Sequence, residues 1–411
     1  MKTAIREIKV GLDYGSGVQS VGRLAIRNGV IYFEYDNTFL EGNLEISPIK
    51  LPLQRGVIEL PREPFEGLVG VFNDSLPDGW GRLLFDRMLR NEGVLPSEIT
   101  PLDRLAHVGL QGLGALVYEP DESPKFDDEI IDLDVLASQT KEVLEGDSDE
   151  VIAELLALNG SSAGARPKAL IGVDKERKNI SFGALQLSDD FEHWMVKFPN
   201  SQDGKDAGAI EYVYALMATE AGIVMPNVHL FSSQMGNGYF AVKRFDRSEN
   251  KRLHMHTVSG LIHNNFRFPS LDYEDLLSLT SFLTKDIREV EKMFRLAVFN
   301  VMAHNRDDHA KNFTFLMNEI GEWKLSPAYD LTFSNGPGGE QSTMVMGEGR
   351  NINLKHLLKL GSEAQLSKGF IDNVIDKTLS ALNKWEILSK NYGVNDSNIQ
   401  LINRKISNFL N

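Results

Sequence analysis

Two acidic residues and an asparagine carry the clearest chemical signal in this sequence. Asp307 precedes Asn312 by five residues. A further acid, Asp330, follows after two predicted strands that form a hairpin. Phosphoryl transfer of the protein-kinase type needs an Asp that accepts the proton of the attacking hydroxyl, an Asn five residues later, and a second Asp that helps to hold Mg²⁺. The joint spacing therefore indicates a metal-dependent phosphotransferase. Taken singly, these residues would also suit a solvated loop with a helix cap.

The elements around this segment would position the three side chains. Apolar residues spaced by three and four predict a helix before it, with one face made of Ile287, Val290, Phe294, Ala297, Val298 and Val301. Residues 313–316 are predicted as a strand, and Gly321 turns the chain into a second strand at 323–325. The acid then follows in SPAYD at 326–330. The predicted order is helix, polar loop, hairpin, acid.

Two longer motifs resemble a known family. NRDDHAKNFTFL at 305–316, followed by SPAYDLT at 326–332, is similar to the catalytic core of the HipA serine/threonine kinases, the toxins of bacterial toxin–antitoxin pairs. FNDSLPDGWGR at 72–82 is similar to the signature of the HipA N-terminal domain, although by itself it would also make a turn with Trp80 in a core. The chain departs from the eukaryotic kinase pattern, because Leu331 and Thr332 follow Asp330 and no His directly precedes Arg306. Activation-loop control of the usual kind is therefore not expected.

Composition excludes several classes of function. The 411 residues suffice for two or three domains. With 58 acidic and 43 basic residues the net charge is −15, which disfavours direct binding to nucleic acid or to an anionic membrane. Cysteine is absent, and neither a signal-peptide core nor a membrane-spanning apolar run is visible. A cytoplasmic protein without membrane contact is expected.

The predicted fold class is α+β. It comprises a kinase-like two-lobed fold, with a β-rich small lobe and a mostly helical large lobe, preceded by a small β-rich N-terminal domain. Residues 1–60 show short strand patterns with a hairpin turn at Asn28-Gly29, and PDESPKFDD at 120–128 is the best linker candidate. The expected domains are residues 1–120, 121–247 and 248–411. A strand at 180–185, a mobile glycine-rich loop at 336–349 and helices over 352–410 are also predicted.

A loop rich in small residues opens the predicted small lobe. It runs NGSSAGARPK from 159 to 168, so backbone N–H groups could approach a phosphate with the Lys168 ammonium beside it. A plain turn with no role in phosphate binding remains an alternative interpretation of such a loop. The HipA resemblance implies that it covers the nucleotide, through Ser162, Ala163, Gly164 and Lys168, and that a serine in it is autophosphorylated to inactivate the enzyme. Alignment on Ala163–Ala165 favours Ser161 as that serine, with Ser162 as the alternative.

Further nucleotide contacts are expected along the two lobes. Lys197 alternates with aromatic residues on a predicted strand at 194–198, where a small-lobe lysine holds nucleotide phosphates. Glu211 begins a predicted helix to Ala221 and could pair with Lys197, although a Glu at a helix start is favourable in any case. If the resemblance holds, the backbones of Lys243 and Phe245 form the hinge that binds adenine, and Tyr329 packs against the nucleotide.

The expected mechanism is ATP-dependent phosphorylation of a protein serine or threonine. Asp307 would deprotonate the hydroxyl, and Asn312 and Asp330 would hold Mg²⁺. Asp308 could share the work of Asp307, but the spacing to Asn312 favours Asp307. The resemblance further implies an aminoacyl-tRNA synthetase as target, persistence through stalled translation, and a helix-turn-helix antitoxin with which the toxin co-represses its operon, so that DNA is met only through the antitoxin.

Other classes of function remain open from the sequence. A small-molecule phosphotransferase would use the same Asp–Asn pair but would not need the N-terminal 120 residues. A non-catalytic pseudokinase corepressor is disfavoured by the intact Asp307, Asn312, Asp330 and Lys197. A metallohydrolase using His304, Asp308 and His309, or a zinc site at His254 and His256, is weakly supported without cysteine or a histidine-rich context.

Overall fold

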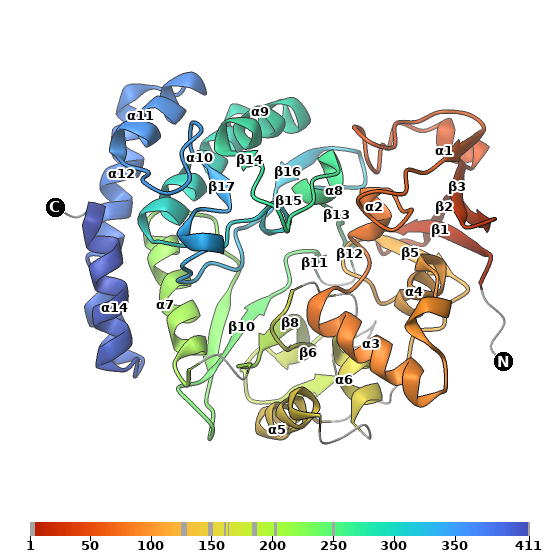
Figure 1. Ribbon diagram of the computed structural model, residues 1–411, viewed down its shortest axis with the longest axis horizontal. Coiled ribbons are helices and arrows are strands. Elements are labelled where there is room, and N and C mark those ends of the chain that lie inside the picture. The colour runs from red at the N-terminus through yellow and green to blue at the C-terminus, as the bar shows by residue number, and fades with distance from the viewer. Residues whose placement is uncertain are drawn as a thin grey trace. The chain divides into compact units, whose positions relative to one another are not determined.

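The protein divides into two compact units. The computed structural model describes residues 5–124, 130–146, 151–159, 162, 164–182, 187–200, 204–248 and 251–409. Unit 1 comprises Met1–Asp203, Ala241–His263 and Leu316–Glu322, and unit 2 comprises Gly204–Phe240, Asn264–Phe315 and Trp323–Asn411. In Figure 1, β1 to β3 lie at the red end of the colour bar and α11, α12 and α14 at the blue end. The division into three sequence domains stays a prediction.

Unit 1 begins with an antiparallel sheet. Its strand order is β4-β3-β2-β1-β5, formed by β1 (Glu7–Asp13), β2 (Val18–Arg27), β3 (Val30–Tyr35), β4 (Val57–Glu59) and β5 (Leu116–Glu119). The predicted turn joins β2 to β3, because Asn28 and Gly29 both have positive φ and Arg27 pairs with Val30. Buried and partly exposed residues alternate along β3, so one face packs into the core. The helices of this region are α1 (Asn37–Leu40), α2 (Gly70–Asn73), α3 (Gly79–Asn91), the short η1 (Pro96–Glu98) and α4 (Pro101–Val108).

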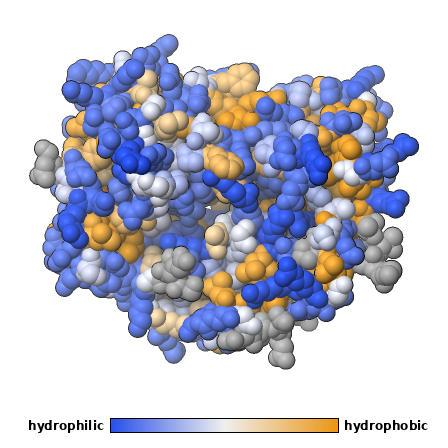
Figure 2. Space-filling model, viewed as in Figure 1, coloured by the Kyte–Doolittle hydropathy of each residue, from blue (hydrophilic) through white to orange (hydrophobic). Residues whose placement is uncertain are grey.

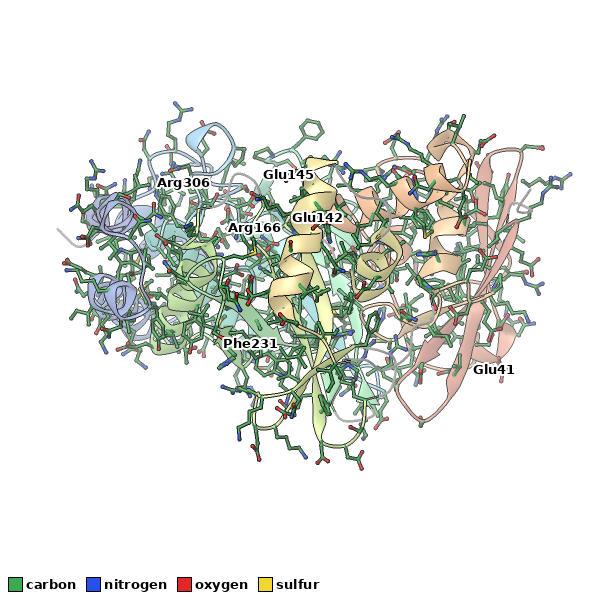
Figure 3. All side chains as sticks on the ribbon, turned by 90° about the horizontal axis from the view of Figure 1, so that it is seen from below. Glu41, Glu142, Glu145, Arg166, Phe231 and Arg306 are labelled. Carbon is green, nitrogen blue, oxygen red and sulfur yellow. The ribbon has the colours of Figure 1, made fainter. Side chains whose placement is uncertain are left out.

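A second sheet follows in unit 1. β7 (Ile180–Phe182), β6 (Lys168–Asp174), β8 (Phe191–Lys197) and β10 (Tyr239–Lys243) are neighbours in that order, and β10 crosses the boundary between the units. α5 (Leu133–Glu145) and α6 (Ile152–Asn159) precede the sheet, and α6 packs against β6 and α3. Figure 3 labels Glu142 and Glu145, which lie on α5. The described part of the predicted 180–185 strand ends at Phe182, and residues 183–186 lie outside the description.

Short elements complete unit 1 after β10. They are β11 (Arg247–Ser248), β12 (Lys251–Arg252), β13 (His254–Thr257) and α8 (Val258–Ile262). Thr257 caps α8, because its side chain accepts from the Gly260 amide. The two histidines of β13, His254 and His256, are fully buried.

Unit 2 is mostly helical. Its helices are α7 (Ala207–Glu220), α9 (Tyr273–Thr284), α10 (Ile287–Met302), α11 (Leu354–Glu363), α12 (Lys368–Leu382), α13 (Trp385–Asn391) and α14 (Asp396–Ile406), with 3₁₀ turns η2 (Ala310–Asn312), η3 (Pro337–Gly339) and η4 (Ser407–Phe409). Its strands are β9 (Val228–Phe231), β14 (Leu271–Asp272), β15 (Thr314–Met317), β16 (Trp323–Leu325) and β17 (Thr343–Met344), of which β15 also crosses into unit 1. α12 packs against α10 and α7. The β-rich beginning and helical end confirm the predicted α+β class.

The core of unit 2 confirms most of the predicted apolar helix and corrects one residue of it. Val290, Phe294, Ala297, Val298 and Val301 are buried on α10. Ile287, predicted on the same face, is 56% exposed, because α10 begins at this residue directly after its cap Asp286.

One predicted helix start and one predicted loop differ from the structure. α7 begins at Ala207 and not at Glu211, so Glu211 lies a full turn inside the helix and its position is not explained by the helix dipole. The segment predicted as a mobile loop at 336–349 contains η3 and β17, and β17 pairs in parallel with β14. Gln341, Ser342 and Thr343 within it are buried. Glycine content alone therefore gave a wrong prediction for this segment, because tertiary contacts hold it in place.

One face of the molecule can be judged for polarity from the space-filling view. The face seen in Figure 2 is mainly hydrophilic, with hydrophobic side chains in scattered patches. In the described part of the chain, no helix combines the length and the apolar composition that crossing a bilayer would need.

Candidate active site

The polar segment begins where α10 ends in a Schellman motif. His304 takes the left-handed conformation, with φ of 56°, and its amide bonds to the Val301 carbonyl at 3.3 Å. The Asn305 amide reaches back to the Asn300 carbonyl at 2.8 Å. These two bonds satisfy carbonyls that the helix end leaves without partners. The following residues are thereby directed away from the helix axis as a loop.

Asp307 and Asn312 lie together in this loop. The Asn312 side-chain amide donates to the Asp307 carbonyl oxygen at 2.8 Å, and the Asn312 backbone amide bonds to the His309 carbonyl at 2.8 Å. The side chain of Asp307 is exposed and lines a pocket of about 540 Å³ within unit 2. The five-residue spacing is therefore one compact turn that presents a carboxylate to solvent.

The hairpin brings the chain at Asp330 back to the same loop. The Ser326 amide continues the β15–β16 ladder by bonding to the Thr314 carbonyl at 2.9 Å. The Tyr329 hydroxyl lies 2.6 Å from both the Thr314 hydroxyl and the Lys311 carbonyl oxygen. Asp330 itself has a φ of 58°, a left-handed conformation that costs energy for a residue with a side chain and often marks a functional position. Tyr329, the neighbour of Asp330, is thus held against the segment that carries Asn312.

Asp308 has a structural role that differs from that of Asp307. Its carboxylate is fully buried and accepts hydrogen bonds from the Tyr273 hydroxyl at 2.5 Å, the Gln341 amide at 2.9 Å and the Thr343 backbone amide at 3.1 Å. Burial raises the pKa of Asp308 to about 7, although these donors lower it. Asp308 therefore anchors the loop and does not face solvent with Asp307.

These contacts remove the metallohydrolase alternative. The carboxylate of Asp308 is committed inside unit 2, and the His304 ring stacks on Phe333 with centroids 5.4 Å apart. Among the described residues, no group of three or more His, Cys, Asp and Glu side chains is arranged to hold a metal ion. The partners of Asp308 come from 33 to 35 residues away, so no spacing motif could have shown them.

In unit 1, two of the expected phosphate-binding lysines face each other. Lys168 and Lys197 are direct partners in the antiparallel register of β6 and β8. Trp194, Val196 and Phe198 are buried while Lys197 is only half-buried, which confirms the predicted alternation.

The loop before β6 is partly described. Ser162 is buried, and its hydroxyl donates to the Asn159 side chain at 2.8 Å. The Gly164 amide donates to the Asp78 carboxylate, and its carbonyl accepts from the Trp80 amide at 3.1 Å. Ser161 and Ala163 lie outside the described residues. In this conformation the Gly164 amide is already bonded to the Asp78 carboxylate. A phosphate could accept from this amide only by displacing that carboxylate.

The segment predicted as a hinge follows β10 and lies beside a buried cluster of charged side chains, which the sequence did not indicate. The Lys243 side chain pairs with Glu192 at 2.6 Å, and Phe245 lies in the bend that follows. Asp246 accepts from Arg244 at 2.8 Å, from Arg247 at 2.6 Å and from the Gly114 amide at 2.8 Å. Burial alone raises the pKa of Asp246, but the two arginines outweigh it and hold the pKa well below its usual value. The cluster ties the hinge to the glycine turn at 112–114, which is therefore a packed turn.

A chain of side chains in unit 1 has the connectivity of a hydrolase triad. The Ser47 hydroxyl lies 2.9 Å from His256 Nε2, and His256 Nδ1 lies 2.7 Å from the Asp74 carboxylate. Ser47 and His256 are fully buried, so no substrate could reach the hydroxyl. The chain joins α2 to β13 and acts as a structural link.

Glu211 is buried on α7, at 2% exposure. It belongs to unit 2 and Lys197 to unit 1, so their pairing stays a prediction.

Among the comparisons with known proteins, two family profiles match this chain. The family profile of the HipA N-terminal domain matches residues 16–119, and that of the HipA-like C-terminal domain matches residues 160–385. Y4dM of Sinorhizobium fredii, named as a suspected kinase, is 23% identical over 412 residues, covering 92% of this chain and 91% of that protein. The solved HipA of Shewanella oneidensis, in complex with HipB and operator DNA, matches with a TM-score of 0.68 at 15% identity, covering 98% of this chain and 97% of that chain.

Proposed function

This chain belongs to the HipA family, and from that premise we propose that it is an ATP- and Mg²⁺-dependent serine/threonine protein kinase acting as a toxin. The observation that carries the proposal is the hydrogen bond from the Asn312 side chain to the Asp307 carbonyl oxygen. It closes the loop so that the Asp307 carboxylate is exposed beside a pocket. Asp307 would orient the acceptor hydroxyl and take its proton.

The metal site of the proposal uses Asn312 and Asp330. Because the Asn312 Nδ2 atom donates to Asp307, its Oδ1 oxygen is the atom left to face a metal. Amide and carboxylate oxygens are the hard ligands that Mg²⁺ prefers, and a site with few protein ligands is typical where substrate phosphates supply the rest. When held by Asn312 and Asp330, Mg²⁺ would supply positive charge that offsets the negative charge of the phosphates.

We further propose the residues that hold the nucleotide. We assign the phosphates to Lys168 and Lys197, which are cross-strand partners on β6 and β8, since ammonium groups attract phosphate. The loop residues Ser162, Ala163 and Gly164 would close over the phosphates after Gly164 exchanges its bond with Asp78 for one with phosphate. The backbones of Lys243 and Phe245 would bind adenine, and Tyr329 would pack against the nucleotide.

The partners in the proposal follow from the family. The related HipA of Shewanella oneidensis is solved with HipB and operator DNA, which supports a helix-turn-helix antitoxin as the partner of this chain. A net charge of −15 suits a basic partner. We propose that the chain binds DNA only indirectly, through that partner. We propose an aminoacyl-tRNA synthetase as the protein substrate and Ser161, with Ser162 as the alternative, as the inactivating autophosphorylation site.

Phosphate transfer from labelled ATP tests the proposal. The wild type, Asp307→Ala and the control Glu363→Ala, exposed on α11, are incubated with Mg²⁺ and a bacterial protein extract. Asp307→Ala is expected to lose about 10²- to 10⁴-fold in rate, as for a positioned general base, while Glu363→Ala keeps the wild-type rate. Wild-type-level labelling by Asp307→Ala would refute the mechanism, and an inert wild type would favour a pseudokinase. Ser161→Ala and Ser162→Ala identify the autophosphorylated residue.

A further inference from the structure

The turn that begins α3 lies against the proposed nucleotide loop, and both belong to unit 1. This turn is the DGWG part of the FNDSLPDGWGR motif, at residues 78–81. α3 packs against α6, the helix that leads into the loop at 159–168, and the two helices are neighbours in Figure 1. A side chain at Gly81 would meet the side-chain amide of Asn159, the last residue of α6. The motif is therefore in direct contact with the start of the loop.

The same turn engages both backbone groups of Gly164. The Trp80 amide donates to the Gly164 carbonyl oxygen at 3.1 Å, and the Asp78 carboxylate accepts from the Gly164 amide. Gly79 has a φ of 46°, and a Cβ atom at this position would lie 2.5 Å from the Gly164 carbonyl oxygen. A residue with a side chain could not take this conformation at this distance, so the glycine permits the close approach.

The carboxylate of Asp78 is used in an unusual way. Asp78 is the N-cap residue of α3, but its side chain makes no capping hydrogen bond to its own helix. An aspartate at this position ordinarily accepts from an amide of the first helical turn. Here the carboxylate accepts instead from Gly164, 86 residues further along the chain. The helix start therefore gives up its usual cap in favour of the loop.

The surroundings of the Gly164 amide are those expected for a phosphate. A methyl group on Gly164 would meet the ammonium of the buried Lys168, so a cation lies beside the same residue. A backbone amide of a small-residue loop next to a lysine is a donor set that suits phosphate oxygens. Because the Asp78 carboxylate is also an anionic oxygen acceptor, it occupies a donor that a nucleotide phosphate would need.

We propose that Asp78 is an autoinhibitory residue, whose carboxylate competes with the phosphates of ATP for the Gly164 amide and so lowers the affinity of the chain for nucleotide. The inference rests on the proposed kinase function, because it takes the loop at 159–168 as the nucleotide loop. Bound ATP replaces the hydrogen bond from Gly164 to Asp78 and leaves the bond from Trp80 in place. The half-buried carboxylate then turns to solvent. The apparent affinity for ATP is the intrinsic affinity reduced by the fraction of molecules in which Asp78 has left the amide.

Nucleotide binding by the full chain tests the inference. Titration calorimetry measures the Kd of AMP-PNP, a non-hydrolysable ATP analogue, in the presence of Mg²⁺, and the Kd of adenosine, which has no phosphate. Asp78→Ala should bind AMP-PNP about 10- to 100-fold more tightly than the wild type, as the loss of a competing charge-assisted hydrogen bond implies. Adenosine should bind both proteins with the same Kd, because it has no phosphate to compete with Asp78.

Two further variants separate competition from a change in folding. Asp78→Asn keeps the size and an acceptor oxygen but loses the charge, so its gain in affinity for AMP-PNP should be smaller than that of Asp78→Ala. Glu92→Ala removes an exposed carboxylate at the other end of α3 and should keep the wild-type Kd. A partly unfolded protein binds its ligand more weakly, so a folding defect cannot produce the expected gain. If Asp78→Ala does not fold, the Asp78→Asn variant decides.

The outcomes distinguish this inference from the kinase proposal. Equal or weaker binding of AMP-PNP by the Asp78 variants, or an equal gain for adenosine, overturns the role of Asp78 and leaves the kinase proposal standing. If neither the wild type nor any Asp78 variant binds AMP-PNP, the nucleotide site of the kinase proposal fails, and the role of Asp78 fails with it.

Discussion

Replacing Asp308 with asparagine should remove a pH-dependent part of the stability of unit 2. The Asp308 carboxyl is fully buried, and burial raises its pKa from 3.8 to about 7. In the unfolded chain it returns to an ordinary value of about 3.9. Between about pH 4 and about pH 7, the folded protein therefore retains a proton at Asp308 that the unfolded chain has already released.

The sign and size of the effect follow from proton linkage. Because the folded state binds the extra proton, the free energy of unfolding decreases as the pH rises from about 4 to about 7. The stabilisation is fully present below about pH 4 and is lost as the pH passes the folded pKa. About three pH units at about 1.4 kcal/mol each give a loss of roughly 4 kcal/mol. Asparagine does not titrate, so Asp308→Asn lacks this dependence.

The Asp308→Asn substitution also lowers the free energy of unfolding by an amount that does not depend on pH. Asparagine can place its oxygen where Tyr273 and Gln341 donate, but its amide then faces the Thr343 N–H, which donates to Asp308 in the wild type. Two donors facing each other in a buried site cost about 1–3 kcal/mol. The variant should therefore be less stable than the wild type at acidic pH, and this difference should shrink as the pH rises.

Urea unfolding of the full chain at pH values from about 5 to 8 measures the difference between the two proteins. Hydrogen exchange of the Thr343 amide reports local opening at the site itself. Asp376→Asn, an exposed acid on α12, is the control for removal of a carboxylate in unit 2. A stability difference between wild type and Asp308→Asn that is the same at pH 5 and pH 8 would refute the assignment of a proton to the buried carboxyl.

Three further substitutions test other contacts. Tyr329→Phe removes the hydroxyl that bonds to the Lys311 carbonyl, so phosphate transfer should fall by about 2- to 10-fold with unchanged far-ultraviolet circular dichroism. Asp246→Ala leaves buried arginines without their counter-ion, and urea unfolding should show a loss of about 3–5 kcal/mol. Gly70→Ala would push a methyl group into the backbone of Gly260, and a thermal melt should show a cost of about 1–3 kcal/mol, where an unchanged melting temperature would contradict the close packing.

Local patterns predicted the elements of the fold well. The spacing of apolar residues identified α10, and the Asn28-Gly29 pair identified the β2–β3 turn. The second hairpin strand, Trp323–Leu325, has the bounds that the sequence predicted. Helical period and turn chemistry are properties of neighbouring residues, so they can be read without knowledge of the fold.

Predictions failed where a residue's environment comes from distant parts of the chain. Glycines at 336–349 suggested mobility, but Gln341 and Thr343 are buried and bond to Asp308. Glu211 was expected at a helix start, yet α7 begins at Ala207. Composition indicates what a segment could do when isolated, whereas burial depends on what packs against it.

The sequence by itself determined the spacing of the proposed catalytic residues, because Asp307, Asn312 and the hairpin to Asp330 lie within one short stretch. Only the tertiary structure decided which of two adjacent acids is exposed and which is an anchor, since the partners of Asp308 lie more than thirty residues away in either direction along the chain. Tertiary structure also placed the carboxylate of Asp78 on the amide of Gly164, 86 residues further along the chain. Chemical type is encoded residue by residue, but exposure, charge balance and partners arise only when distant segments pack together.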